Sequence, residues 1–338
     1  GWYSDVYKNY EKTLTKARDT YKRLFHAEYG GDSHIGRHSE VPIDVYRKGT
    51  TTGGDEPINK IKSSSIANIG DWSESYIVDL FDWYLHLTEN LDWFTGSAQW
   101  IFRDFTTPLR PENPIPYVNE KGLIDMNNNP KDAYYVFKSY WTTNPKFCYI
   151  ESHTWLERYG AANAKKEVNV FSNCLEVELI INGVSQGRLT RDSKKFPAAG
   201  LSWQVNFVEG ENQIQAIGYD GDKKVTEDNL KISYTTKKND TPENFALSQS
   251  RMKDGNYLIT AYAVDKNGKH CIDFNGRVYF TVLSGGKFLE NLGTSFGSSV
   301  IEMANGKAQI IFKHFPFQKG VIEARNQDFK GAYITVEN

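Results

Sequence analysis

The sequence of 338 residues predicts a multidomain protein in which an alternating α/β portion precedes two all-β, immunoglobulin-like sandwiches. Helix-period and strand-like segments alternate up to about residue 145, and short strands separated by turn signals follow to the end. We expect domains over 1–145, 146–236 and 237–338, because the polar stretch KKNDTP over 237–242 has the composition of a linker.

The α/β portion is predicted from the helical spacing of apolar residues and from short apolar runs. Apolar positions recur every three or four residues over 5–24, 73–91 and 131–141, which predicts three amphipathic helices. Apolar runs predict buried strands over 24–29 and 92–102. Because helices and strands alternate, the two strands should be parallel. A parallel pair with bare edges would be unstable, so we expect this portion to associate with itself or with an absent N-terminal part of the same protein.

The two sandwiches are predicted from short alternating strands and their turns. Strands over 176–181 and 213–217 run towards Asn182-Gly183 and Asp220-Gly221, dipeptides that favour tight hairpin turns, and a strand over 230–234 closes the block. About seven such strands in this block are typical of an immunoglobulin-like sandwich. The pattern recurs over 244–338, with Asn-Gly pairs at 267–268, 275–276 and 305–306.

Charge and hydropathy argue against two classes of partner. Lys and Arg number 40 and Asp and Glu number 42, so a net charge of −2 gives no field to hold nucleic acid or an anionic membrane. No apolar run approaches the roughly 20 residues of a membrane helix. We therefore expect no nucleic-acid partner and no membrane span. We also expect no cofactor.

The cysteines and the first residue bear on the compartment. Cys148, Cys174 and Cys271 are isolated in the sequence and odd in number, which indicates neither a disulfide framework nor a zinc site. The chain begins with Gly1 rather than Met, so we expect its start to be a cut that removes any targeting segment. The compartment stays open, and we favour the periplasm or the exterior of a bacterium.

Two compositional features fit a carbohydrate-binding protein but also have plainer explanations. Aromatic residues make up 14% of the chain, which would suit flat sugar rings, although strands commonly use aromatics. A Gly-, Ser- and Thr-rich segment over 48–65 lacks periodicity, so we predict a surface loop that either lines a site or is an ordinary insertion.

Titratable side chains crowd into the loop that follows the first predicted strand. The segment 25–40 reads FHAEYGGDSHIGRHSE and contains Glu28, Asp32, His34, Arg37, His38 and Glu40. The spacing of His34 and His38, with Glu40 nearby, would permit a metal ion. No helix is predicted to bring them onto one face, so we expect no metal there.

Five motifs stand out in the first part of the chain: AEYG at 27–30, GSAQWIFRD at 96–104, FTTPLRP at 105–111, VNEKGL at 118–123 and PKDAYYV at 130–136. Together they resemble glycoside hydrolase family 2, especially its β-galactosidase-like bacterial members. The resemblance covers residues 1 to about 160, and the block 167–187 is similar to the immunoglobulin-like module that follows the barrel in such enzymes. The family works on a (β/α)₈ TIM barrel, so the resemblance implies that residues 1–145 are the last strands and helices of a partial barrel.

The resemblance also implies roles for residues. The nucleophilic glutamate of the family ends the seventh strand in a motif like Glu-Tyr-Gly, which makes Glu28 the expected nucleophile, at the strand end where such barrels gather their sites. Trp100 would form an aromatic floor under the sugar, or else belong to the barrel core. Asp104 could bind a sugar hydroxyl, or pair with Arg103 or Arg110. His34, Arg37 and His38 could hold Glu28 ionised or reach hydroxyls.

One catalytic group is expected to be missing. Retaining glycosidases need a second carboxyl group as acid/base, which the family carries in an Asn-Glu pair at the fourth strand, upstream of this chain. Asn119-Glu120 follows the eighth strand, so we reject it for this role. Glu74 begins a helix and is expected to be a cap or surface residue.

Asn119-x-Lys121-Gly122 resembles the signature with which β-glucuronidases of the family bind a uronic acid carboxylate, for which a Lys121 ammonium is suited. β-Galactosidase-like members carry a similar motif, and Lys121 could also be an ordinary surface residue. The sequence therefore predicts the C-terminal part of a retaining exo-β-glycosidase acting on terminal β-galactosides of oligo- or polysaccharides. The alternatives are a β-glucuronidase, or non-catalytic sandwiches that bind carbohydrate or protein.

Overall fold

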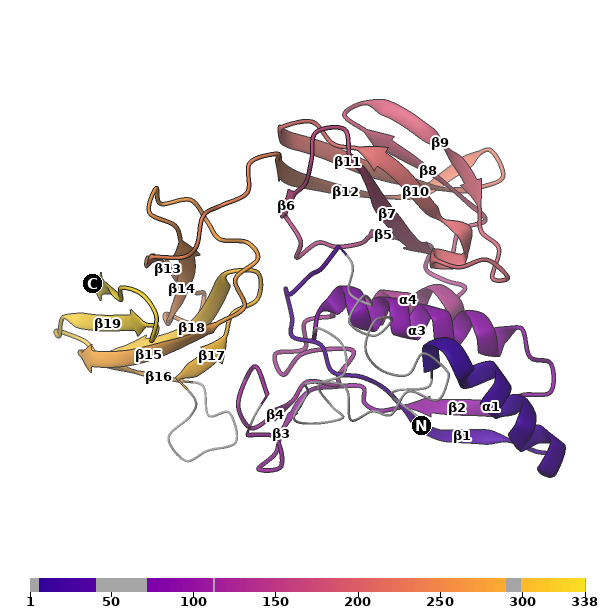
Figure 1. The fold of residues 1–338 in the computed structure, drawn as a ribbon, viewed down its shortest axis with the longest axis horizontal. Coiled ribbons are helices and arrows are strands. Elements are labelled where there is room, and N and C mark those ends of the chain that lie inside the picture. The colour runs from indigo at the N-terminus through magenta and orange to yellow at the C-terminus, as the bar shows by residue number, and fades with distance from the viewer. Residues whose placement is uncertain (1–5, 41–71, 112, 290–298, 338) are drawn as a thin grey trace. The chain divides into compact units, whose positions relative to one another are not determined.

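A computed structural model describes residues 6–40, 72–111, 113–289 and 299–337, and shows a mostly β multidomain chain with few helices (Figure 1). The loop predicted over 48–65 lies outside the described residues. The chain divides into two compact units: unit 1 comprises 1–104 and 121–236, and unit 2 comprises 105–120 and 237–338. In the described part of the chain, no helix is both long and apolar enough to cross a membrane.

The α/β portion of unit 1 contains the predicted helices and strands. The helices are α1 (Val6–Thr20), α3 (Glu74–Glu89) and α4 (Asp132–Trp141), and the strands are β1 (Phe25–Tyr29) and β2 (Gly96–Gln99). β1 and β2 pair in parallel, as the alternation predicts. Two predictions were too long: α1 stops at Thr20, and β2 is four residues long because a turn at 92–93 precedes it.

Aromatic packing fixes β1 against the helices. The Tyr29 ring stacks on Tyr84 of α3 with centroids 3.7 Å apart, and Phe81 meets Tyr29 edge-on. The loop after β1 passes close to α3, because a Cβ on Gly31 would lie 2.4 Å from Ile77 Cδ1, and a larger residue would require the Ile77 side chain to move. Ser73 caps α3 by accepting a hydrogen bond from Tyr76 N.

The sandwich of unit 1 is built from β5 (Cys148–Ile150), β6 (Glu157–Tyr159), β7 (Lys165–Ser172), β8 (Glu176–Ile181), β9 (Val184–Thr190), β10 (Ser202–Asn206), β11 (Gly210–Asp220) and β12 (Lys223–Thr235). They form a three-stranded sheet, β10-β7-β5, and a five-stranded sheet, β6-β12-β11-β8-β9. Asn182 and Gly183 both have positive φ and join β8 to β9, as predicted for a tight Asn-Gly turn.

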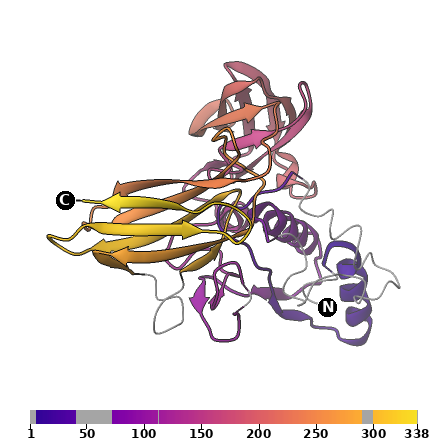
Figure 2. The ribbon, with the colours of Figure 1, turned by 60° about the vertical axis from the view of Figure 1, so that its left-hand side comes forward.

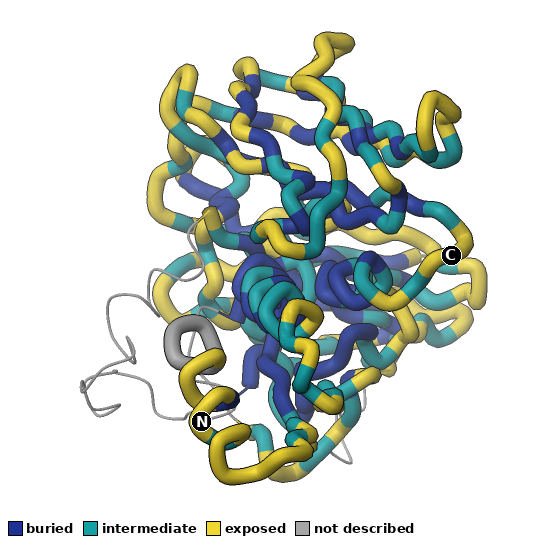
Figure 3. Tube along the Cα trace, turned by 90° about the vertical axis from the view of Figure 1, so that its right-hand side faces the viewer, coloured by how far each residue is buried: buried dark blue, intermediate teal, exposed yellow. Residues whose placement is uncertain are grey.

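One apolar core serves the whole of unit 1. It is continuous from Tyr29 through the buried faces of α3 and α4 to the facing sides of both sheets, where residues such as Val170 and Leu179 are fully buried. Figure 3 shows this as buried positions concentrated where the helices lie between the strand pair and the sandwich. The helical layer and the sandwich therefore stabilise each other.

Unit 2 is a second pair of four-stranded sheets (Figure 2). The sheets are ordered β13-β14-β18-β16 and β17-β15-β19-β20, and their strands are β13 (Asn244–Arg251), β14 (Tyr257–Val264), β15 (Arg277–Ser284), β16 (Gly286–Phe288), β17 (Val300–Glu302), β18 (Lys307–His314), β19 (Gly320–Arg325) and β20 (Ala332–Val336). The short antiparallel strands β3 (Phe105–Thr106) and β4 (Val118–Asn119) also belong to this unit. Pro114, in the segment between them, accepts a hydrogen bond from Glu302 N at 2.8 Å.

Candidate functional site

Two predicted site residues lie at the carboxyl ends of the parallel strands. Glu28 is the fourth residue of β1, is partly exposed, and precedes the buried Tyr29. Trp100 follows β2 directly, and its backbone N donates to Tyr29 O at 2.7 Å. The parallel register thus brings the backbone of Trp100 beside the residue that follows Glu28. The Trp100 side chain is 41% exposed, which leaves part of it available to a ligand.

Lys121 lies next to the end of β2. Its carbonyl oxygen accepts hydrogen bonds from Ile101 N and from the Gln99 amide, at 3.1 and 3.2 Å. Its ammonium is not at the surface: the side chain is 5% exposed, and Nζ lies 4.0 Å from Asp32 Oδ2 in the loop after β1. Burial strengthens the attraction of this ammonium for a neighbouring negative charge.

Asp104 is held in a buried ion pair that the sequence did not suggest. Its carboxylate lies 2.9 Å from Lys131 Nζ, a partner that neither alternative named. Gly122 N donates to Asp104 Oδ1 at 2.7 Å, and a Cβ on Gly122 would lie 2.3 Å from Asp104 N. The glycine of the Asn-x-Lys-Gly motif is therefore required by the close approach of this loop to Asp104.

Lys131 joins both loops. Its ammonium also donates to Ser33 O at 3.0 Å, and its backbone N donates to Leu123 O. Lys131 is the N-cap residue of α4 and is 1% exposed. It connects the loop after β1, next to Glu28 in sequence, to the segment that carries Lys121.

His38 is turned into the junction between the helices and the sandwich. Its Nε2 contacts Thr154 Oγ1 at 2.8 Å and lies 3.6 Å from Glu74 Oε2, and its ring stacks on Trp155. Burial, and secondarily the charge of Arg158, lowers the pKa of His38 to about 3, so the imidazole is neutral at ordinary pH. None of these contacts joins His38 to Glu28, so they do not support the prediction that His38 holds Glu28 ionised.

The carboxylates around His38 sit at the starts of two helices. Glu74 is fully buried rather than at the surface, and accepts hydrogen bonds from Gly36 N, Asp132 N and the Thr154 hydroxyl. Asp132 Oδ1 accepts from the hydroxyls of Tyr149 and Ser152. Burial raises the pKa of both carboxyl groups, and for Asp132 the neighbouring Glu74 raises it further.

His38, Glu74 and Asp132 form the group in the described chain whose geometry comes nearest to a metal site, with ligand atoms within 4.8 Å of one another. Glu74 lies near Nε2, however, whereas Asp132 lies 3.9 Å from Nδ1. These groups already contact protein hydroxyls, since Thr154 Oγ1 lies 2.8 Å from Nε2 and the hydroxyls of Tyr149 and Ser152 donate to Asp132.

His34, Arg37 and Glu40 have structural contacts in the same loop. His34 N donates to Trp72 O, and Arg37 O accepts from Glu74 N. Both side chains are buried. Glu40 forms ion pairs with Arg158 and Lys166 of the sandwich, at 2.7 and 3.0 Å, and so does not join His34 and His38 in the metal arrangement considered from their spacing. Burial alone would raise the pKa of Glu40, but the hydrogen bonds and charges of Arg158 and Lys166 outweigh it, so the pKa is lowered.

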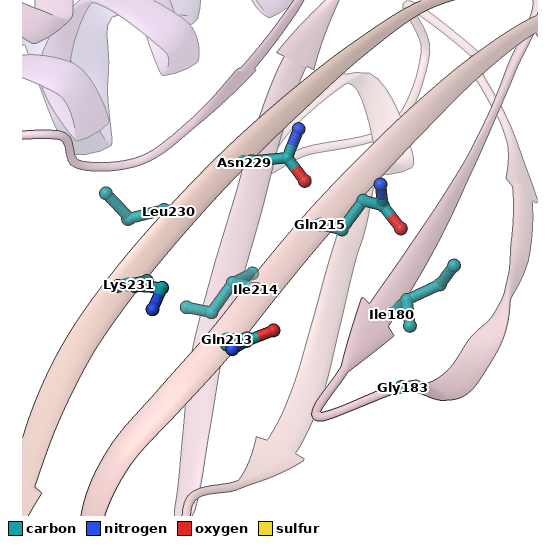
Figure 4. A pocket seen from close by; sticks show the side chains of 8 residues that line it. All are labelled: Ile180, Gly183, Gln213, Ile214, Gln215, Asn229, Leu230 and Lys231. Carbon is teal, nitrogen blue, oxygen red and sulfur yellow. The ribbon is translucent and has the colours of Figure 1, made fainter.

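Sequence reasoning missed Lys131, Asp132 and the buried state of Glu74. Their positions in the sequence could have identified them, because each lies at the start of a predicted helix. The first backbone N–H groups of a helix lack partners within the helix and are often bonded by polar side chains. A separate hollow of about 310 Å³ lies on the sandwich between β8, β11 and β12, lined by amides such as Gln213, Gln215 and Asn229 (Figure 4). None of the predicted site residues lines it.

Comparisons with known proteins agree with the resemblance seen in the motifs. Residues 163–226 match the family model described as "Domain of unknown function (DUF4982)". A protein of Formosa agariphila named "Putative beta-glucuronidase" is 50% identical over 341 residues, covering 100% of this chain and 41% of the relative.

Solved structures give the same family. A β-glucuronidase of Parabacteroides merdae matches with a TM-score of 0.88 and 36% identity, over 99% of this chain and 43% of its own. The apo structure of Bacteroides uniformis β-glucuronidase 3 matches with a TM-score of 0.85 and 41% identity, over 100% and 42%. The chain thus spans about two fifths of the length of these proteins. It belongs to glycoside hydrolase family 2, the family of β-glucuronidases and β-galactosidases, and corresponds to the C-terminal portion of such an enzyme.

Proposed function

We propose that this chain forms the C-terminal portion of a retaining β-glucuronidase and supplies its nucleophile, Glu28. The observation that carries the proposal is the 50% identity to a protein named as a β-glucuronidase, which extends over the whole chain. The comparisons favour the β-glucuronidase alternative over the β-galactoside substrate that the sequence analysis preferred.

On this proposal residues 1–145 are the last strands and helices of a TIM barrel, with β1 and β2 as its seventh and eighth strands. The parallel pairing of β1 and β2, each followed by a helix, supports that assignment. Residues 146–236 and 237–338 are immunoglobulin-like sandwiches. The rest of the barrel would cover the two free edges of the β1–β2 pair.

The proposed chemistry divides the work between this chain and the missing part. The Glu28 carboxylate attacks the anomeric carbon and forms a glycosyl-enzyme, while an acid/base outside this chain protonates the departing oxygen. Water then attacks the anomeric carbon and gives its proton to the same acid/base, which now acts as a base, and Glu28 is released as a carboxylate. The partly exposed Trp100 supports the sugar ring from the neighbouring strand end.

Lys121 is the proposed ligand of the uronic acid carboxylate. Its ammonium is almost fully buried, with Asp32 Oδ2 4.0 Å away, and burial strengthens the attraction between an ammonium and a carboxylate. Asn119 of the same motif is proposed to act with Lys121, and Gly122 lets the motif approach Asp104.

The test is covalent trapping. The chain, alone and within the protein that carries it, is incubated with 2-deoxy-2-fluoro glucuronyl fluoride or the galactosyl analogue and then examined by intact mass and peptide mapping. Fluoride leaves without a proton donor, so the acid/base is bypassed, and the fluorine at C2 slows release of the sugar. We expect an adduct on Glu28 from the glucuronyl reagent.

Glu28→Gln is the matched control, because it keeps the size of the side chain and removes the nucleophilic oxygen. An adduct on another residue would refute the role of Glu28. An adduct from the galactosyl reagent alone would restore the β-galactosidase assignment. No adduct in either form of the protein would favour non-catalytic sandwiches that bind carbohydrate or protein.

A further inference from the structure

Two cysteines that are distant in sequence meet inside the sandwich of unit 1. Cys148 begins β5, and its antiparallel partner on β7 is Ser172, two residues before Cys174. Both thiols are free, and each contacts the other's segment: Cys148 Sγ lies 3.5 Å from Ser172 Oγ, and Cys174 Sγ lies 3.9 Å from Phe147 O. Cys174 is buried and Cys148 is half-buried. Spacing alone gave no reason to pair them.

Gly218 of β11 shows how close the two sulfurs are. A Cβ at this position would lie 2.6 Å from Cys174 Sγ and 2.9 Å from Cys148 Sγ. Both sulfurs therefore occupy the space that a side chain of β11 would fill, between the three-stranded sheet that contains β5 and the five-stranded sheet that contains β11. The β11–β12 pairing is irregular immediately after Gly218.

The surrounding backbone already holds the two positions together. Phe147 N donates to Asn173 Oδ1 at 3.0 Å, and Ser172 Oγ donates to Phe147 O at 2.6 Å. Lys146 Nζ donates to Asn173 O at 2.9 Å. These bonds join the residue before Cys148 to the two residues before Cys174, so little backbone movement is needed to bring the sulfurs into bonding distance.

The local charges favour one thiolate. The neighbouring Cys148 thiol lowers the pKa of Cys174, and the Lys146 ammonium acts in the same direction. The pKa of Cys148 is raised, first by the neighbouring Cys174 thiol and then by burial. The pair therefore gives up one proton more readily than two isolated buried thiols would.

We propose that Cys148 and Cys174 are a redox-active thiol pair that closes to an intramolecular disulfide when it meets a small organic disulfide. One protein thiolate attacks a sulfur of the oxidant and releases one thiol. The second protein thiolate attacks the mixed disulfide and releases the other thiol. The protein loses two hydrogen atoms, and the oxidant becomes two thiols.

The bond would fasten the start of the sandwich. β5 is the first strand after α4. Tyr149 of β5 and Ser152, two residues after it, donate hydrogen bonds to Asp132 at the beginning of that helix. A disulfide here closes a loop over 148–174 and restricts the unfolded chain. We expect it to raise the melting temperature of unit 1 by about 5–10 °C.

Oxidised glutathione is the oxidant for the test, because its two halves leave as two separate thiols, as the proposed exchange requires. The folded chain is oxidised, denatured and treated with iodoacetamide, and its peptides are mapped by mass. We expect one linked peptide pair containing Cys148 and Cys174, with Cys271 alkylated. Cys271→Ser should behave like the unchanged chain, whereas Cys148→Ser should give no linked pair and no rise in melting temperature.

A second probe tests proximity without oxidation. Phenylarsine oxide bridges two neighbouring thiols, so it should bind one equivalent to the folded chain and to Cys271→Ser, but should not be retained by Cys148→Ser or Cys174→Ser. The proposal is overturned if Cys148 and Cys174 are both alkylated after oxidation, or if the linked pair contains Cys271. Failure of the arsenical to bind the reduced, folded chain also overturns it.

Discussion

The Lys131 ammonium lies 2.9 Å from Asp104 Oδ2, and the two side chains are 1% and 6% exposed. Because Lys131 also bonds Ser33 O, and Asp104 also accepts from Gly122 N, this ion pair joins the loop after β1 to the loop after β2. These loops adjoin the proposed nucleophile and contain the proposed carboxylate ligand. The geometry at the two strand ends therefore depends on a residue at the start of α4.

Lys131→Met should destabilise unit 1 by about 3–5 kcal/mol, since it leaves the Asp104 carboxylate buried without its cation. Chemical denaturation measures this. Lys223→Met, at an exposed position, is the control and should cost little. The double variant Asp104→Asn, Lys131→Met should lose less than the two single variants together, because no unpaired charge remains. A loss below about 1 kcal/mol for Lys131→Met would contradict the ion pair's structural role.

Lys121→Met should reduce kcat/KM for a β-glucuronide about 10- to 100-fold in the protein that carries this chain, as expected for loss of a charge-assisted hydrogen bond worth about 1.5–3 kcal/mol. The rate with the corresponding β-galactoside should stay unchanged. Lys121→Arg keeps the charge and should retain part of the preference. Equal losses on both sugars would show that Lys121 supports the loop and does not read the carboxylate.

Glu28→Gly should abolish hydrolysis, and added azide should restore turnover of an activated aryl glucuronide. Azide takes the place of the carboxylate at the anomeric carbon, so the product is a glycosyl azide of inverted configuration. Nuclear magnetic resonance of the product gives the configuration. Trp100→Gly is the comparison, because loss of an aromatic contact leaves no nucleophile to replace. Hydrolysis at an undiminished rate by Glu28→Gly would remove Glu28 from the mechanism.

Asp82 makes the stability of unit 1 depend on pH. Its carboxylate accepts from Ala198 N and the Tyr140 hydroxyl, and burial raises its pKa from 3.8 to about 7. The folded state therefore holds the proton more tightly than the unfolded state does. This stabilisation is complete below pH 3.8 and is lost as the pH rises to about 7, by at most about 1.4 kcal/mol per pH unit.

Asp82→Asn removes the titrating proton and should flatten this part of the pH profile. We expect the free energy of unfolding of the variant, relative to the unchanged chain, to rise by about 3–4 kcal/mol between pH 4 and pH 7. Denaturant titrations across that range measure it. Asp222→Asn, at an exposed site, is the matched control. Parallel profiles for Asp82→Asn and the unchanged chain would show that Asp82 is not protonated in the folded state.

Local elements could be predicted because each depends on neighbours in sequence. The periodicity over 131–141 gave α4 at Asp132–Trp141, and Asn182-Gly183 gave the turn between β8 and β9. The boundaries of β2 could not be read from its apolar run, because a turn at 92–93 shortens it. The motif at 27–30 placed Glu28 next to a strand end, which depends only on β1.

The sequence by itself determined the family, the parallel β1–β2 pair and the residue types at the strand ends, since motifs and periodicities are local. Only the tertiary structure decided which charged groups meet. It paired Asp104 with Lys131, buried His38 beside Glu74, and brought Cys148 to Cys174. Burial removes water and forces each polar group to find a partner, and that partner can come from any part of the chain that the packing brings near.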